Sequence, residues 1–196
     1  GSGHGFRPYI TMSQNLLPFE SSEYRRYGWS WMRLRLFLLR HAQTQSFRHA
    51  DGLILLTNYA RQTVMTRIQQ AHGRWIAIPH GINPQFYQSP RVQYPLTTYS
   101  PIKPLRLLYV SIINVYKHQW HVAEAVAKLK NEGFPITLEL VGPAYKPALQ
   151  RLQTTLQQID PNSDFIHYRG SIKYADLPST YHQADIFIFA SSCENM

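Results

Sequence analysis

Residues 184–195 read ADIFIFASSCEN, and this stretch decides which fold the sequence predicts. Residues 186–190 form an apolar run without alternation, which is typical of a strand buried on both faces of a helix-covered parallel sheet. The run ends in Ser191, Ser192, Cys193 and Glu194. Ligands of open parallel sheets bind at the carboxyl ends of the strands, so these residues lie where a site is expected.

The residues upstream of this stretch repeat the same alternation of strand and helix. Strands are predicted over residues 105–110, 135–141 and 165–169, and helices follow them from about 119 to 130, from 147 to 159 and from 176 to 183. This alternation indicates an α/β fold in which right-handed crossovers connect parallel strands.

A second group of elements occupies the first half of the chain. Strands are predicted over residues 8–12, 50–57 and 75–78, and helices from 22 to 40 and from 59 to 70, the latter capped by Asn58. Residues 87–104 contain four prolines and no apolar periodicity. We therefore expect a first domain over residues 1–88, a linker over 89–104 and a second domain over 105–196.

Two interpretations stay open for the helix expected from Ser22. Its arginines are Arg25, Arg26, Arg33 and Arg40, and its apolar stripe is Tyr24, Tyr27, Trp31, Leu34 and Leu38. The stripe either packs against the core, which we favour, or lies on an anionic membrane with its aromatic rings at the headgroup level.

The composition restricts the partners. The chain has a formal net charge of +9 and one cysteine, so anionic partners are favoured and a cysteine-based zinc cluster is excluded. No nucleic-acid-binding motif is present, so we expect no nucleic-acid partner. His118 and His121 lack a third metal ligand, so no metal site is expected. The sequence contains no run of eighteen apolar residues, so no membrane-spanning helix is predicted.

The polar residues that follow the predicted strands converge on one rim of the second sheet. They are residues 111–117, Gly142 and Pro143, Gly170 and Ser171, and residues 191–194. Small residues let a ligand approach the backbone, helix N-termini favour anions, and the rim offers one lysine and one carboxylate. This combination suits a diphosphate that carries a polyhydroxyl group. Neither a dinucleotide-binding glycine motif nor a P-loop is present.

These motifs resemble a known family. They are IPHGI at 78–82, Lys117 after a strand, LVGP at 140–143, YRG at 168–170, and Tyr181 followed by ADIFIF at 184–189. The chain resembles the retaining GT-B glycosyltransferases of the family 4 type, the glycosyl transferases of group 1. The resemblance implies two Rossmann-like domains, both incomplete here, so we expect an internal fragment that is inactive by itself.

The resemblance also implies roles for individual residues. Lys117 and Glu194 are the expected catalytic residues, the first on the donor diphosphate and the second on the sugar hydroxyls. The other expected donor-binding residues are Ser111, Gly142, Pro143, Ser171, Ser192 and Asn195, and His80 and Gly81 are expected in a loop that faces the cleft. Ser111 and Ile112 stand where the family often has Gly-Arg, and His118 stands where glycine is common.

The activity that this family implies is transfer of a sugar from a nucleotide-sugar donor, with retained configuration, to a glycan or lipid-linked acceptor. It implies no cofactor and no metal, and it suggests a cytoplasmic protein that can associate with a membrane. Two alternatives stay open. One is a sugar-nucleotide epimerase or phosphorylase on the same fold, and the other is a non-catalytic basic module that binds membranes or nucleic acid.

Overall fold

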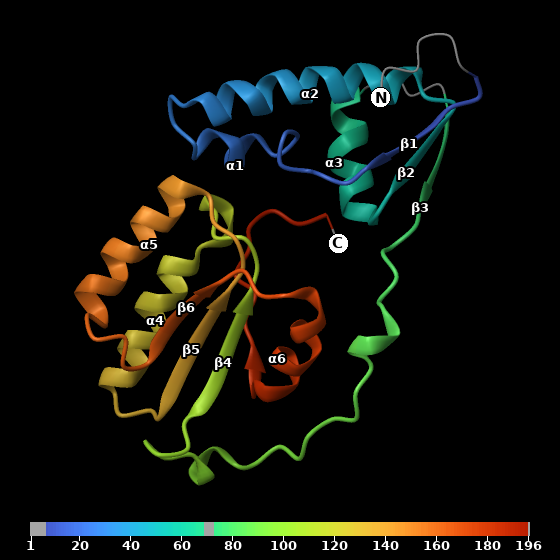
Figure 1. Cartoon of the computed structure of the whole chain (residues 1–196). Helices are drawn as coiled ribbons and strands as arrows, with labels where there is room; N and C mark the ends of the chain where they lie inside the picture. The colour runs from blue at the N-terminus through green and yellow to red at the C-terminus, as the bar shows by residue number, and fades with distance from the viewer. Residues whose placement is uncertain (1–6, 69–72, 196) are drawn as a thin grey trace. The chain divides into compact units, whose positions relative to one another are not determined.

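The chain divides into two compact units in a computed structural model that describes residues 7–68 and 73–195. One unit comprises Gly1–Ile82 together with Ser192–Met196, and the other comprises Asn83–Ser191. Figure 1 shows the helices and strands of both. Each unit has its own parallel sheet, so each is described by itself.

The first unit is a three-stranded parallel sheet with helical crossovers. Its strands are β1 (Ile10–Ser13), β2 (Gly52–Leu55) and β3 (Arg74–Ala77), in the order β1-β2-β3. Helices α1 (Ser21–Arg25) and α2 (Trp31–His49) connect β1 to β2, and α3 (Asn58–Ile68) connects β2 to β3. The buried side chains of α3 are Ala60, Val64 and Ile68, which lie at helical spacing on one face.

The single helix predicted from Ser22 is wrong, because the chain breaks between α1 and α2. Gly28 has a φ of +56°, which continues no right-handed helix and suits glycine. The N-cap of the long helix is Ser30, whose Oγ accepts a hydrogen bond from the amide of Arg33 at 3.3 Å. Likewise Thr57, and not Asn58, accepts from the first turn of α3, at 3.0 Å from the amide of Ala60. The predicted end of α3 near Gln70 lies outside the described residues.

The core-packing interpretation of the apolar stripe on α2 is also wrong. The buried side chains of α2 are Leu36 and Phe47, whereas Trp31, Leu34 and Leu38 are exposed. Tyr27 is buried as expected. Periodicity identified an apolar face, but the first unit covers the other side of the helix.

The second unit confirms the predicted alternation of strand and helix. Its strands are β4 (Leu105–Val110), β5 (Ile136–Val141), β6 (Ile166–Gly170) and β7 (Ile186–Phe187), in the order β6-β5-β4-β7 and all parallel. Its helices are α4 (Gln119–Asn131), α5 (Lys146–Ile159) and α6 (Leu177–Gln183), and its short 3-10 turns are η1 (Pro84–Phe86), η2 (Leu96–Thr98), η3 (Val115–Lys117) and η4 (Tyr174–Asp176).

The core of the second unit lies between the sheet and the helices α4 and α5. Tyr109, Leu138 and Leu140 from the strands pack with Trp120 from α4 and Leu152 from α5. In Figure 1, α4 and α5 lie together beside the sheet, whereas α6 lies at the β4–β7 end. This packing fixes the strands whose carboxyl ends form the predicted rim.

The last strand differs from its prediction. Residues 186–190 were expected to be buried on both faces, but β7 contains only Ile186 and Phe187, which are 44% and 46% exposed. The reason is its edge position, because it pairs with β4 and with no other strand among residues 7–68 and 73–195.

The segment expected as a linker carries a side chain that is bound to the second unit. Arg91 Nη2 lies 2.8 Å from Asp185 Oδ1 and donates to the carbonyl of Ala184 at 2.7 Å. The other oxygen of Asp185 accepts from the amide of Arg106 at 2.8 Å. Asp185 therefore connects residue 91, the start of β4 and the start of β7.

We predict that Asp160→Ala destabilises the second unit by about 2–4 kcal/mol, because two buried amides and one partly buried amide lose their carboxylate acceptor. The carboxylate of Asp160 accepts from the amides of Asp164, Phe165 and Ile166 at 2.8, 3.0 and 2.8 Å. It thereby joins the end of α5 to the start of β6. The loss of stability is measured as the decrease in the free energy of unfolding, obtained from urea denaturation. Asp164→Ala, at an exposed carboxylate, is the matched control and is expected to change this free energy by less than about 0.5 kcal/mol.

Candidate functional site

The carboxyl ends of β4, β5 and β6 form a rim that brings several predicted site residues together. The amide of Ser111 donates to the carbonyl of Val141 at 2.9 Å, and the amide of Gly142 donates to the carbonyl of Gly170 at 2.8 Å. Beyond the strands, the amide of Ile113 donates to Pro143 at 2.8 Å. Ser111, Gly142 and Pro143 are therefore neighbours, and Ser171 follows Gly170 on the same rim.

Gly142 holds the closest approach on this rim. Its φ is +140°, and a Cβ atom at this position would lie 2.1 Å from the carbonyl oxygen of Ser111. No side chain fits at that distance, so the close pairing of the two strand ends requires glycine. The sequence predicted Gly142 as a ligand contact, and its structural role is this backbone approach.

Gln119 was missed by the sequence reasoning and organises the loop between β4 and α4. Its side chain is 1% exposed. Its Nε2 donates to Ser111 Oγ at 3.0 Å and to the carbonyl of Ile112 at 2.9 Å, while its Oε1 accepts from the amide of Asn114 at 3.4 Å. The one available signal was a glutamine in the first turn of an otherwise apolar-faced helix.

Lys117 is buried at the end of η3, directly before α4. Its Nζ lies 4.6 Å from the ring centroid of Phe189 and 5.1 Å from that of Tyr116. Its carbonyl oxygen accepts from the hydroxyl of Tyr109 at 2.6 Å. The main chain and the ammonium group are thus both positioned by aromatic residues. Such contacts stabilise a cation that has lost much of its water.

His118 has a φ of +56°. This left-handed conformation separates η3 from α4 and turns the chain directly after Lys117. Glycine adopts this conformation without strain, whereas a residue with a side chain, such as His118, rarely does. The ring of His118 stacks on that of His121 at 5.6 Å between centroids. In the described part of the chain, no three His, Cys, Asp or Glu residues lie close enough together to hold a metal ion.

Tyr168 supports the rim from β6. Its hydroxyl donates to the carbonyl of Gly142 at 3.0 Å. Burial raises the pKa of Tyr168 above its ordinary value, because desolvation disfavours the phenolate. The hydroxyl therefore stays protonated and continues to donate at neutral pH.

The remaining predicted site residues belong to the first unit. Ser192, Glu194 and Asn195 follow β7 in the chain, but their segment is grouped with residues 1–82. There, Asn195 Nδ2 donates to the carbonyl of Ser13 at 2.8 Å. Ser13 Oγ and Asn195 Oδ1 are buried without a hydrogen-bond partner among the described residues. His80 and Gly81 follow β3 in an exposed segment.

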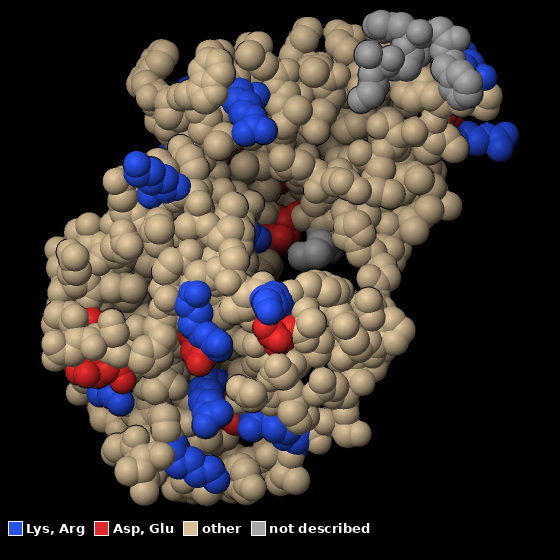
Figure 2. All heavy atoms as spheres, in the orientation of Figure 1, with Lys and Arg blue, Asp and Glu red and all other residues tan. Residues whose placement is uncertain are grey.

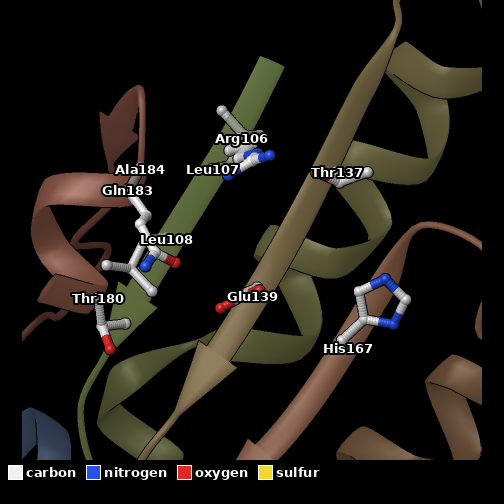
Figure 3. Close-up of a pocket in the computed structure, with 9 residues that line it drawn as sticks. All are labelled: Arg106, Leu107, Leu108, Thr137, Glu139, His167, Thr180, Gln183 and Ala184. Carbon is white, nitrogen blue, oxygen red and sulfur yellow. The ribbon is translucent and has the colours of Figure 1, made fainter. Parts of the chain in front are cut away.

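A cavity of about 340 Å³ lies on the second sheet, away from the predicted site residues. Figure 3 shows Thr137 and Glu139 from β5, His167 from β6 and Gln183 from α6 around it. Glu139 also forms an ion pair with Arg169 at 3.3 Å. The cavity lies on the sheet face opposite the buried strand residues Leu138 and Leu140, and it contains none of the residues that the sequence assigned to chemistry.

Residues 104–196 match the family described as "Glycosyl transferases group 1", which confirms the predicted resemblance for the part that contains the rim. Comparison with curated protein sequences finds no match.

Solved structures share the fold of both units. HepE from Anabaena, solved with UDP and glucose, is 19% identical with a TM-score of 0.63; the match covers 96% of this chain and 48% of HepE. Sucrose-phosphate synthase from Thermosynechococcus elongatus is 17% identical with a TM-score of 0.68, over 98% and 47%. The pneumococcal O-GlcNAc transferase GtfA is 20% identical with a TM-score of 0.56, over 79% and 28%. The α/β fold of the GT-B type is confirmed. The chain spans about half the length of HepE and of sucrose-phosphate synthase, and less than a third of the length of GtfA.

We predict that Gly142→Ala destabilises the second unit more than Gly133→Ala does. Both glycines have positive φ, but a Cβ at Gly133 meets nothing within 4 Å. Gly133→Ala is therefore expected to cost about 1 kcal/mol of conformational strain, and Gly142→Ala roughly 1–3 kcal/mol more from overlap with Ser111. Urea denaturation of the two variants measures the difference. Equal losses would show that the strand ends separate freely.

Proposed function

We propose that the whole protein transfers a sugar from a nucleotide-sugar donor, because residues 104–196 match the family of glycosyl transferases of group 1. The acceptor is a hydroxyl group of a glycan or of a lipid-linked molecule, and the configuration at the anomeric carbon is retained. The bond between this carbon and the diphosphate oxygen breaks. The bond to the acceptor oxygen forms on the same face of the sugar, and the acceptor proton leaves with the diphosphate or to solvent.

The family match over the unit that contains the rim is the observation that carries this proposal. The physical properties of the rim support it further. The amino end of α5 follows Pro143, Ala144 and Tyr145 at this rim. A helix N-terminus suits a diphosphate, because the helix dipole attracts its charge.

Lys117 has the central role in the proposed reaction. Negative charge develops on the leaving diphosphate as the glycosidic bond breaks, and a fixed cation in a dry site stabilises this charge more than one in water. The side chain of Lys117 is buried and lies against Phe189 and Tyr116. Its surroundings therefore favour strong attraction to phosphate oxygens and little reorganisation during the reaction.

Glu194 and its neighbours have the second proposed role. The carboxylate of Glu194 accepts hydrogen bonds from the donor sugar, and Ser192 and Asn195 contribute polar groups on either side of it in the chain. His80 and Gly81 belong to a loop on the acceptor side. The reaction needs no metal ion, because the lysine and the backbone amides neutralise the diphosphate. Chelation with EDTA is expected to leave turnover unchanged.

We predict that Lys117→Ala in the whole protein lowers turnover by roughly ten- to a thousandfold, which is the range for removal of one charge-stabilising donor. Lys117→Arg keeps the charge and is expected to lose less. Product formation from radiolabelled nucleotide sugars measures the effect, and anomeric NMR of the product tests retention. Lys128→Ala, at an exposed lysine of α4, is the control. Wild-type turnover of a folded Lys117→Ala protein contradicts the role.

Glu194→Gln is expected to change the handling of the sugar rather than of the nucleotide. The amide keeps the size of the side chain but loses the charge that strengthens hydrogen bonds to hydroxyl groups. The affinity for the nucleoside diphosphate should stay within about twofold, while turnover with the nucleotide sugar falls by at least about tenfold. Calorimetric titration and steady-state kinetics separate the two quantities. Parallel losses in both would assign Glu194 to the nucleotide instead.

A further inference from the structure

A row of aromatic rings in the second unit links the segment before β4 to the residues that end β7. Phe86 lies in η1, and its ring meets that of Tyr181 from α6 edge-on, at 6.2 Å between centroids. Tyr181 packs against Phe187 of β7 at 5.3 Å, and Phe187 stacks on Phe189 at 5.9 Å. We call Phe86, Tyr181, Phe187 and Phe189 the aromatic row. Rings at these separations attract one another beyond the area that they bury.

One end of the aromatic row contacts Lys117. The Nζ atom of Lys117 lies 4.6 Å from the ring centroid of Phe189, and Lys117 is 6% exposed. Figure 2 shows Lys and Arg side chains on the surface of the second unit, and the other lysines of residues 83–191 are not buried. A buried ammonium group has few water molecules around it, so a neighbouring ring contributes to where it lies.

The other end of the aromatic row is Phe86. Among residues 81–90, Phe86 is the one whose side chain is not exposed. Its ring also meets Tyr174 of η4 edge-on, at 5.7 Å between centroids. Phe86 therefore fastens this part of the chain to α6 and η4, at the start of the row that ends on Lys117.

We propose that Phe86 is a positioning residue for Lys117, and that it acts through the other three rings of the aromatic row. Contiguous packed side chains carry energetic coupling between distant residues, and loss of one ring leaves room for the next to change its rotamer. If the rings only stabilised the unit, loss of Phe86 would lower stability and leave the ammonium group of Lys117 in place. An effect on the diphosphate rests on the proposed function, whereas the placement of the ammonium group does not.

Acetylation of Lys117 in the folded chain tests the placement of its ammonium group. The chain is treated with N-hydroxysulfosuccinimide acetate, and peptide mass spectrometry compares the rate at Lys117 with that at exposed Lys128. Phe86→Leu removes the ring and is expected to raise this ratio of rates at least about threefold. Phe86→Tyr keeps the ring and should react like wild type. Tyr87→Leu, at a neighbouring ring that is 72% exposed, is the matched control and should also react like wild type.

A double-mutant cycle tests the route through the rings. Phe189→Leu is expected to speed acetylation of Lys117 at least as much as Phe86→Leu, and the double variant no more than Phe189→Leu alone, because the two residues act in series. Independent effects that multiply overturn the proposal, as does an unchanged rate in Phe86→Leu or an equal rise in Tyr87→Leu. Urea denaturation checks that each variant is folded during labelling, and Tyr181→Leu replaces Phe86→Leu if the latter does not fold.

Inorganic pyrophosphate separates this proposal from the proposed sugar transfer. If Lys117 binds a diphosphate, pyrophosphate slows the acetylation of Lys117 in wild type, and Phe86→Leu requires at least about threefold more of it for the same protection. Faster acetylation in Phe86→Leu without protection by pyrophosphate supports the coupling and contradicts the role of Lys117 in the transfer. Protection by pyrophosphate with an unchanged rate in Phe86→Leu supports that role and overturns the coupling.

Discussion

The close contact between Gly142 and the carbonyl of Ser111 is the constraint on which the candidate site depends. Two parallel strands normally diverge once their hydrogen bonds end, but here the pairing continues past β4 and β5 through Ile113 and Pro143. A side chain at position 142 would force the strand ends apart. Because the strand ends stay together, the loop that follows β4 is compact. The buried side chain of Gln119 stabilises this loop by donating hydrogen bonds to Ser111 and Ile112. Lys117 is then fixed between this loop and α4.

Lys117 also depends on a residue that lies far from it in the sequence. Phe189 follows β7, and its ring lies against both the ammonium group of Lys117 and the ring of Tyr109. The hydroxyl of Tyr109 in turn holds the carbonyl of Lys117. One aromatic pair thus positions the main chain and the side chain of the same residue. Lys117, which we propose binds the diphosphate, is therefore positioned by β4 and by the segment after β7, two neighbouring strands of the sheet, and not by its own loop alone.

The sequence predicted those features that depend on local pattern. The largely apolar segments at 105–110 and 135–141 predicted strands, and their alternation with helices implied the parallel sheet and its rim. Gly142 and Lys117 became candidate site residues because they follow such strands. Features that depend on what covers a surface were not predictable: the stripe on α2 is apolar but faces solvent, and β7 is apolar but lies at an edge. Gln119 was missed because a buried polar side chain becomes recognisable only once its partners are known. The break at Gly28 was overlooked because one glycine is tolerated in many helices.

The pairing of β7 with β4 has a consequence for biosynthesis. β4 is the first strand of its unit, and β5, β6 and all three helices of the unit precede β7 in the chain. A ribosome therefore delivers β4 with one edge open, and this edge closes only when Asp185 and Ile188 pair with Arg106 and Leu108. An open apolar edge is a template for incorrect strand pairing. The nascent chain is thus prone to aggregate in the interval between completion of β6 and emergence of β7, because the edge of β4 is then unpaired. A chaperone that binds during this interval protects the open edge.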